Sequence, residues 1–259
     1  MSITSVSVTA RRSPLRHAPL FAAALAAISV LLLGFAPLGW RLGWWHYRFA
    51  LLNLLPWAAY FGVAALIVSV LTLCLGRSRI EWRGVAIAVA AFVLGGLVAY
   101  VPWHYDAMRR TLPPINDITT DTADPPAFAA VISARKAEEG NLVAYPGAKF
   151  AEQQQRAYAD IVPVVLALPP KAAFERALAA AEQTGWTIAA ADAATGRIEA
   201  TDRSRWFGFT DDIVVRVTPQ GTESRVDVRS SARHGRSDFG VNAARVRAYL
   251  AKLREASGG

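Results

Sequence analysis

Three long stretches without a charged side chain constrain this chain more than any other feature of its sequence. They run over Ala18–Trp40, Phe49–Gly76 and Gly84–Trp103. Each has at least 20 residues, and about 20 residues, at a rise of roughly 1.5 Å each, cross the hydrocarbon core of a bilayer. The sequence therefore predicts a bundle of three transmembrane helices, with the lipid bilayer as its first partner.

Aromatic rings mark the ends of the predicted spans, which we place at about 18–40, 49–75 and 84–103. Tryptophan and tyrosine settle at the headgroup level of a bilayer, and the rings at these ends are Trp40, Trp44, Trp45, Trp82, Tyr100 and Trp103. The first span is expected to stay uncleaved, because its apolar run is too long for a signal peptide and Pro37 adjoins a poor cleavage site.

The placement of arginines predicts the orientation, because cytoplasmic flanks carry more of them. On the side of the N-terminus lie Arg11, Arg12, Arg16, Arg77, Arg79 and Arg83. On the other side lie Arg41, Arg48, Arg109 and Arg110. The excess favours a cytoplasmic basic N-terminus over residues 1–17 and a periplasmic C-terminal domain. We expect a multi-pass protein of the bacterial inner membrane.

Charge is divided unevenly between the two parts of the chain. Residues 1–104 hold eight arginines and one glutamate, whereas residues 105–259 hold 20 basic and 19 acidic side chains. A nucleic-acid binder needs a basic soluble domain, so this near-neutral one excludes that class. No Asp, Glu, Lys, Arg or His lies within a predicted span, which argues against a transporter. Asn53 and Pro56 are interpreted as a packing residue and a kink.

No cofactor or metal site is predicted. Cys74 is the only cysteine and lies in an apolar run, and His234 is the only histidine that does not flank a span. Zinc and iron sites need three or four His, Cys or carboxylate ligands at defined spacings. Glycine-rich phosphate loops are absent as well.

Residues 105–127 are predicted to be a linker, because Pro113-Pro114 and Pro125-Pro126 force extended backbone on their neighbours. A soluble domain follows over 128–259. Its expected elements are helices at about 127–138 and 148–158, a strand at 161–168, a helix from 170 to 185, strands near 186–190, 197–202, 213–217 and 225–229, and a helix at 240–255. This order predicts an α+β domain, with helices on the apolar face of an antiparallel sheet and charges on the other face.

Several motifs run through this region. They are Pro114-Ile115-Asn116-Asp117-Ile118-Thr119-Thr120-Asp121, Asp124-Pro125-Pro126-Ala127-Phe128, Tyr145-Pro146-Gly147, Gly185-Trp186, Gly196-Arg197-Ile198-Glu199-Ala200, the strand 209–217, the strand 224–230 and Gly235-Arg236-Ser237-Asp238-Phe239-Gly240. Over about 112–254 the chain resembles the family known as domain of unknown function 1499. Ala159 stands where that family has a proline. The family has no established activity, so the resemblance implies a domain and no function. The order of elements also resembles, as a pattern only, the helix-grip modules of BamC-type lipoproteins.

The segment from Arg229 to Asn242 is the best candidate for a binding site. Four arginines converge in sequence on the start of the last helix, whose free N–H groups would face an anion. The candidate residues are Arg229, Arg233, Arg236, Ser237, Asp238, Asn242 and Arg245, with Ser237 or Asp238 as the helix cap. The alternative is that aspartates pair with these arginines, which the near-equal numbers of acids and bases favour.

Two other groups of residues suggest sites. Ser230 or Ser231 with His234 would suit a hydrolase, but no nucleophile elbow surrounds them, so a polar loop is the favoured interpretation. Trp206, Phe207 and Phe209 form a candidate interface for a membrane or a partner, and folding over the end of the core is the alternative. We expect a binding or scaffolding module of the cell envelope for an anionic ligand or a protein, rather than an enzyme, and leave its oligomeric state open.

Overall fold

The computed structural model describes residues 17–76, 80–138 and 140–255. The chain divides into two compact units, Met1–Asp106 and Ala107–Gly259. Five of the arginines behind the predicted orientation lie outside the described residues, namely Arg11, Arg12, Arg16, Arg77 and Arg79.

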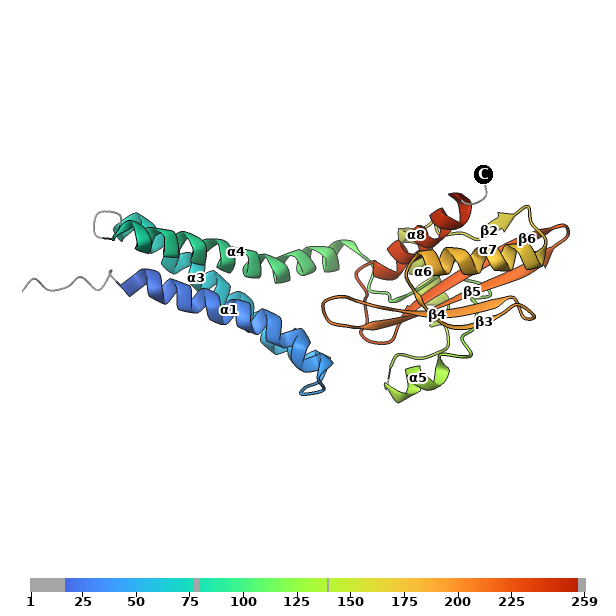
Figure 1. The fold of residues 1–259 in the computed structure, drawn as a ribbon, viewed down its shortest axis with the longest axis horizontal. Coiled ribbons are helices and arrows are strands. Elements are labelled where there is room, and N and C mark those ends of the chain that lie inside the picture. The colour runs from blue at the N-terminus through green and yellow to red at the C-terminus, as the bar shows by residue number, and fades with distance from the viewer. Residues whose placement is uncertain (1–16, 77–79, 139, 256–259) are drawn as a thin grey trace, which may run out of the picture. The chain divides into compact units, whose positions relative to one another are not determined.

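The first unit is a bundle of three long helices, α1 (Ala18–Arg41), α3 (Leu55–Gly76) and α4 (Trp82–Thr111), seen in Figure 1. A short helix, α2 (Tyr47–Phe49), leads through a π-helical turn, η2 (Ala50–Leu54), into α3. Three helical stretches are long and apolar enough to cross a membrane. The predicted three-helix bundle is confirmed.

Small residues allow the helices of this bundle to pack closely. A buried cluster is formed by Ala22, Ala26, Ala65 and Ala91. Gly62 and Gly95 meet so closely that a Cβ atom added to either would lie 2.6–2.7 Å from the carbonyl oxygen of the other. Close backbone contact through small residues is the usual way in which membrane helices associate, because lipid removes the hydrophobic drive.

The second unit is built on a six-stranded antiparallel sheet, which confirms the predicted α+β class. Its strands are β1 (Asp117–Thr119), β2 (Val164–Leu166), β3 (Thr187–Asp192), β4 (Arg197–Arg203), β5 (Thr210–Gln220) and β6 (Glu223–Ala232). They lie in the order β1-β6-β5-β4-β3, and β2 also pairs with β6. The helices are α5 (Ile132–Ala137), α6 (Ala148–Ala157), α7 (Pro170–Gln183) and α8 (Val241–Glu255).

The hydrophobic core lies between the sheet and the two helices α7 and α8, which cover one face (Figure 1). Alternate residues of β5 face this core, as a half-buried strand requires: they are Ile213, Val215 and Val217. The ring of Trp186 stacks on that of Tyr249, whose hydroxyl donates to the Ala177 carbonyl at 3.1 Å.

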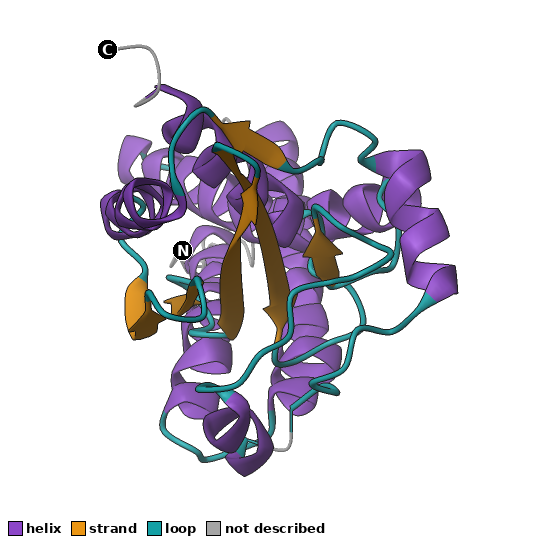
Figure 2. Cartoon of the chain, turned by 90° about the vertical axis from the view of Figure 1, so that its right-hand side faces the viewer, coloured by secondary structure: helices purple, strands orange, loops and turns teal. Residues whose placement is uncertain are grey.

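The opposite face of the sheet is charged, as predicted, but it is covered rather than open. The covering segment runs from 120 to 147 and consists mostly of loops, teal in Figure 2, with α5 as its one helix in the described part. Phe128 and Val131 of this segment pack on Val214 of β5. The charged side chains of this face are therefore largely buried.

The prediction that residues 105–127 form a linker is wrong in its central part. Helix α4 continues to Thr111, and β1 pairs antiparallel with β6, with Ile118 opposite Ser230. Ile115 and Ile118 are 1% and 0% exposed. The flanking prolines do extend the backbone, but the edge of β6 supplies the hydrogen-bond partners that an extended buried backbone needs. That edge is formed by residues more than 100 positions away.

Candidate functional site

A layer of buried ion pairs holds the covering segment on the sheet. Arg229 of β6 binds Asp117 of β1 at two points, Nε to Oδ1 at 2.9 Å and Nη2 to Oδ2 at 2.7 Å. Its guanidinium also lies over the ring of Phe128, 4.7 Å from the centroid. A two-point contact of this kind is the strong form of an ion pair, because charge and geometry match.

Asp212 of β5 is the second centre of this layer. It is 0% exposed and contacts two guanidinium groups, Arg135 at 2.9 Å and Arg233 at 2.7 Å. Arg135 comes from α5 and also donates to the Ser231 hydroxyl at 2.9 Å and to the Ala232 carbonyl at 3.0 Å. Arg135 thus joins the covering segment to the end of β6.

A third cluster lies on the face of the sheet that carries α8. Arg245 of α8 contacts Asp211 at 2.7 Å and Asp202 at 2.9 Å. Burial raises the pKa of Asp211 to about 6, and the charges of Asp238 and Asp202 add to this effect while Arg245 opposes it. Asp238 accepts from the backbone N–H of Asn242 at 2.8 Å and so caps α8. Burial raises the pKa of Asp238 as well.

Three of the four candidate arginines are thus held by carboxylates. Arg229, Arg233 and Arg245 are 2%, 5% and 8% exposed at their side chains and contact Asp117, Asp212 and Asp211 respectively. Ser237 accepts from the Phe239 N–H at 3.3 Å, and Asn242 is buried, donating to the Asn116 carbonyl at 3.2 Å. Arg236 differs: it is exposed and has no ion-pair or hydrogen-bond partner among the described residues.

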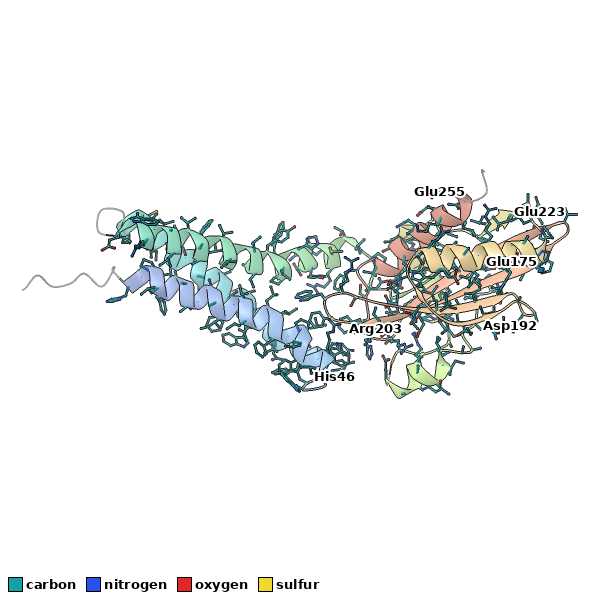
Figure 3. All side chains as sticks on the ribbon, viewed as in Figure 1. His46, Glu175, Asp192, Arg203, Glu223 and Glu255 are labelled. Atoms are coloured by element: carbon teal, nitrogen blue, oxygen red, sulfur yellow. The ribbon has the colours of Figure 1, made fainter. Side chains whose placement is uncertain are left out.

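Arg236 lines a pocket of about 240 Å³. The apolar part of the wall is formed by Pro114, Leu142, Pro146 and Phe150. The polar part is formed by Asn116, Asp117, Arg135, Asn141, Ser231 and Arg236, with the backbone of Gly235. The pocket lies at the end of the sheet where β5 begins and β6 ends. Arg203, the last residue of β4, is at this same end, and Asp192 and Glu223 are at the other end (Figure 3).

Two asparagines hold the loop between β6 and α8 against this pocket. Asn116 Nδ2 donates to the Gly235 carbonyl at 2.6 Å. Asn141 Nδ2 donates to the same carbonyl at 2.8 Å and to that of Ala232 at 3.1 Å. Gly235 has φ +86°, a conformation that glycine adopts without strain. These contacts place Arg236 at the pocket.

The predicted hydrolase residues do not converge on one base. Ser230 faces α8 and its hydroxyl donates to the Asn242 side-chain oxygen. Ser231 is on the opposite face of β6 and accepts from Arg135. His234 Nε2 lies 3.3 Å from the Glu138 carbonyl oxygen. A serine nucleophile has to pass its proton to a base, whereas the Ser230 proton is directed at an amide oxygen.

The aromatic loop between β4 and β5 packs on itself. The rings of Phe207 and Phe209 stack at 5.1 Å between centroids, and Trp206 meets Phe207 edge to face at 5.0 Å. Phe207 is 4% exposed.

Sequence reasoning missed Asn116, Asp117, Arg135 and Asn141 as pocket residues. A signal was present for two of them, since Pro114-Ile115-Asn116-Asp117 is one of the motifs that carry the resemblance. Pro146 and Arg236 come from two further motifs, and the fold brings all three motifs to one pocket. Arg135 and Asn141 lie in no motif, and only the tertiary contacts reveal them.

Comparison with known proteins identifies the same family that the motifs resemble. The model of a family described as "Protein of unknown function (DUF1499)" matches residues 117–253, which is more than half of the chain. No curated protein matches. The resemblance to BamC-type modules, which was inferred from the order of elements alone, stays a prediction. The matched region begins at β1 and ends within α8, so it covers the whole sheet and the pocket beside Arg236 except Pro114 and Asn116, and the chain belongs to the DUF1499 family.

Proposed function

We propose that this protein is a membrane-anchored binding module of the bacterial cell envelope, whose soluble domain takes an anionic ligand in the pocket at Arg236. The observation that carries the proposal is the charge balance of the pocket wall. Asp117 and Arg135, the two buried charges of the wall, are compensated by Arg229 and Asp212 respectively. Arg236 is not compensated among the described residues, so the pocket has one cation to offer.

A pocket of this kind suits binding better than catalysis. Its buried groups are already fixed by each other, so they are preorganised and lose little entropy when a ligand arrives. A single guanidinium offers two parallel N–H donors to a carboxylate or phosphate. With one such contact and a partly apolar wall, we expect affinities of roughly millimolar strength for minimal anions.

Anion binding is tested with the full-length protein in detergent micelles. Inorganic phosphate is titrated at about 20 mM and at about 200 mM salt, and the arginine Nε signals are followed by NMR. Binding should be weaker at the higher salt concentration, because salt screens an exposed charge. Arg236→Gln should abolish the shifts. Arg254→Gln, which removes an exposed arginine of α8 outside the pocket, is the matched control and should keep them. Shifts that survive Arg236→Gln would refute the proposed site.

The periplasmic placement is also a proposal, supported by the six arginines on one side of the spans against four on the other. Alkaline phosphatase and a green fluorescent protein are fused separately after Gly259. The proposal expects an active phosphatase and a dark fluorescent protein. The reverse pattern would move the domain to the cytoplasm.

A further inference from the structure

The pocket presents hydrogen-bond acceptors as well as a cation. Asn116 and Asn141 direct their NH₂ groups at carbonyl oxygens, which only accept, so the orientation of both amides is determined by the network. Their side-chain oxygens therefore point away from these carbonyls. Neither oxygen accepts a hydrogen bond from the described residues, and neither is sealed in the interior.

The position of Asn116 indicates where its free oxygen lies. The residue is 7% exposed and lines the pocket. The side-chain oxygen is accessible, although the residue as a whole is almost entirely buried. We therefore infer that this oxygen is the part of Asn116 that faces the pocket. Asn141, on the covering segment, lines the same pocket and offers the same kind of atom.

Ser231 adds a donor to this set. The residue is 2% exposed, and its hydroxyl oxygen accepts from Arg135 Nη2 at 2.9 Å. Its own proton meets no acceptor among the described residues. A hydroxyl that is held by a guanidinium and keeps its proton free is a donor for an anion. Ser231 and Arg236 thus supply donors, and the two asparagines supply acceptors.

We propose that the ligand of this pocket is a small hydroxylated anion, a carboxylate or phosphate diester that carries hydroxyl groups on the neighbouring carbons. The anionic group binds Arg236 and the Ser231 hydroxyl. The hydroxyl groups donate to the side-chain oxygens of Asn116 and Asn141. This inference rests on the proposed anion binding and adds the chemistry that selects among anions.

The other walls and the charge agree with this ligand class. One uncompensated guanidinium matches one negative charge. The acceptors are neutral amides, which suit hydroxyl donors better than an ammonium ion, because an ammonium would lose its hydration without meeting a free carboxylate. Phe150 and the exposed Leu142 offer apolar surface to the carbon skeleton. A pocket of about 240 Å³ holds a molecule of a few carbons.

The experiment compares two anions of equal charge and carbon number, propanoate and glycerate (2,3-dihydroxypropanoate). Each is titrated into the full-length protein in detergent micelles. The Arg236 Nε signal is followed together with the backbone N–H signal of Gly235, which lines the pocket and stays observable in Arg236→Gln. The two hydroxyls of glycerate should lower its Kd about tenfold relative to propanoate, since each neutral hydrogen bond contributes a factor of a few. Arg236→Gln should abolish both titrations, and Arg254→Gln should change neither.

Asn141→Ala tests the acceptor directly. It should reduce the preference for glycerate over propanoate to about threefold, because only glycerate has donors for the amide oxygen. Both Kd values should rise, since Asn141 also holds the loop that carries Arg236, so the ratio of the two Kd values is the readout. If this variant fails to fold, the comparison in the unaltered protein still decides. In a separate titration, phosphatidylglycerol is added to the micelles, because its headgroup also combines one negative charge with hydroxyl groups. If the Arg236 signal shifts at lower concentrations of this lipid than of glycerate, the ligand is a lipid headgroup.

The outcomes separate the two proposals. Equal Kd values for propanoate and glycerate, both lost in Arg236→Gln, would overturn the hydroxylated ligand and leave anion binding intact. No shift of the Arg236 signal with either anion, with phosphate or with the lipid would overturn both.

Discussion

Arg229 and Asp117 form a two-point ion pair between the adjacent strands β6 and β1, with each side chain only 2% exposed. The pair stands one register step from Ile118 and Ser230, which face the opposite side of the sheet. It joins β1, the first strand along the chain, to β6, the last one. Asp117 also lines the pocket. Its burial makes it a sensitive point of the fold.

Removing one partner of this pair should destabilise the domain strongly. Asp117→Leu leaves the Arg229 guanidinium buried and uncompensated, which typically costs about 3–5 kcal/mol. The double variant Asp117→Leu/Arg229→Met should cost less than the single one, because no charge is stranded. Thermal unfolding of the detergent-purified protein measures both.

The exposed pair Arg156–Glu152, 76% and 61% exposed, is the matched control. Glu152→Gln should cost less than about 1 kcal/mol, as for other surface pairs. Equal costs for Asp117→Leu and Glu152→Gln would contradict the structural role of the buried pair.

Arg233 and Arg236 should respond in opposite ways to the same substitution. Arg233 is paired with Asp212 at 2.7 Å and also contacts Glu138, so Arg233→Gln should cost about 2–4 kcal/mol of stability. Arg236→Gln should change stability by less than about 0.5 kcal/mol, because an exposed side chain without partners leaves nothing unpaired. Melting curves of the two variants would test this difference, and a large loss in Arg236→Gln would contradict it.

The stability of the soluble domain should rise as the pH falls from 8 to 5. The folded-state pKa of Asp211 is about 6, above the ordinary value of 3.8, so folding favours its protonated form. That contribution is present at low pH and is lost as the pH rises through 6. It amounts to roughly 1 kcal/mol between pH 8 and pH 5. Asp238 faces the same cluster, and its raised pKa acts in the same direction.

Melting temperatures measured across this range test the effect, and Asp211→Asn should flatten the profile. Asp121 and Asp160 have lowered pKa values, through backbone hydrogen bonds at Asp121 and the side-chain hydrogen bond from Arg247 at Asp160. Their contributions are lost only below about pH 4, outside the measured window. A wild-type profile that falls between pH 8 and pH 5 would contradict the prediction.

Neighbouring glycines of α4 should differ in their tolerance of alanine. A Cβ atom at Gly95 would lie 2.6 Å from the Gly62 carbonyl oxygen, whereas one at Gly96 would meet Leu66 at 3.5 Å, an ordinary contact. Gly95→Ala should destabilise the bundle by about 1–3 kcal/mol through overpacking. Gly96→Ala should be neutral or slightly stabilising, because alanine favours the helix. Thermal unfolding in detergent compares them, and equal behaviour would mean that the helices do not meet at Gly95.

The architecture followed from local patterns in the sequence. Uncharged runs of 20 or more residues are typical of membrane-spanning helices and reappear as α1, α3 and α4. The alternation along 213–217 and 225–229 reappears in β5 and β6. The cap at Asp238 was also among the residues expected. These features depend on neighbours in the chain, through hydrophobic periodicity and backbone hydrogen bonds, so sequence alone can reveal them.

The assignment of charges depended on the tertiary structure. The sequence contains Arg229, Arg233, Arg236 and Arg245 as four similar side chains near one helix. Folding buried three of them against carboxylates from other elements and left Arg236 at a pocket whose wall comes from three distant segments. An ion pair between residues 112 positions apart, such as Arg229 and Asp117, has no local signature. The periodicity of a strand determines which face a side chain takes, but only the packed fold determines which opposite charge it meets there.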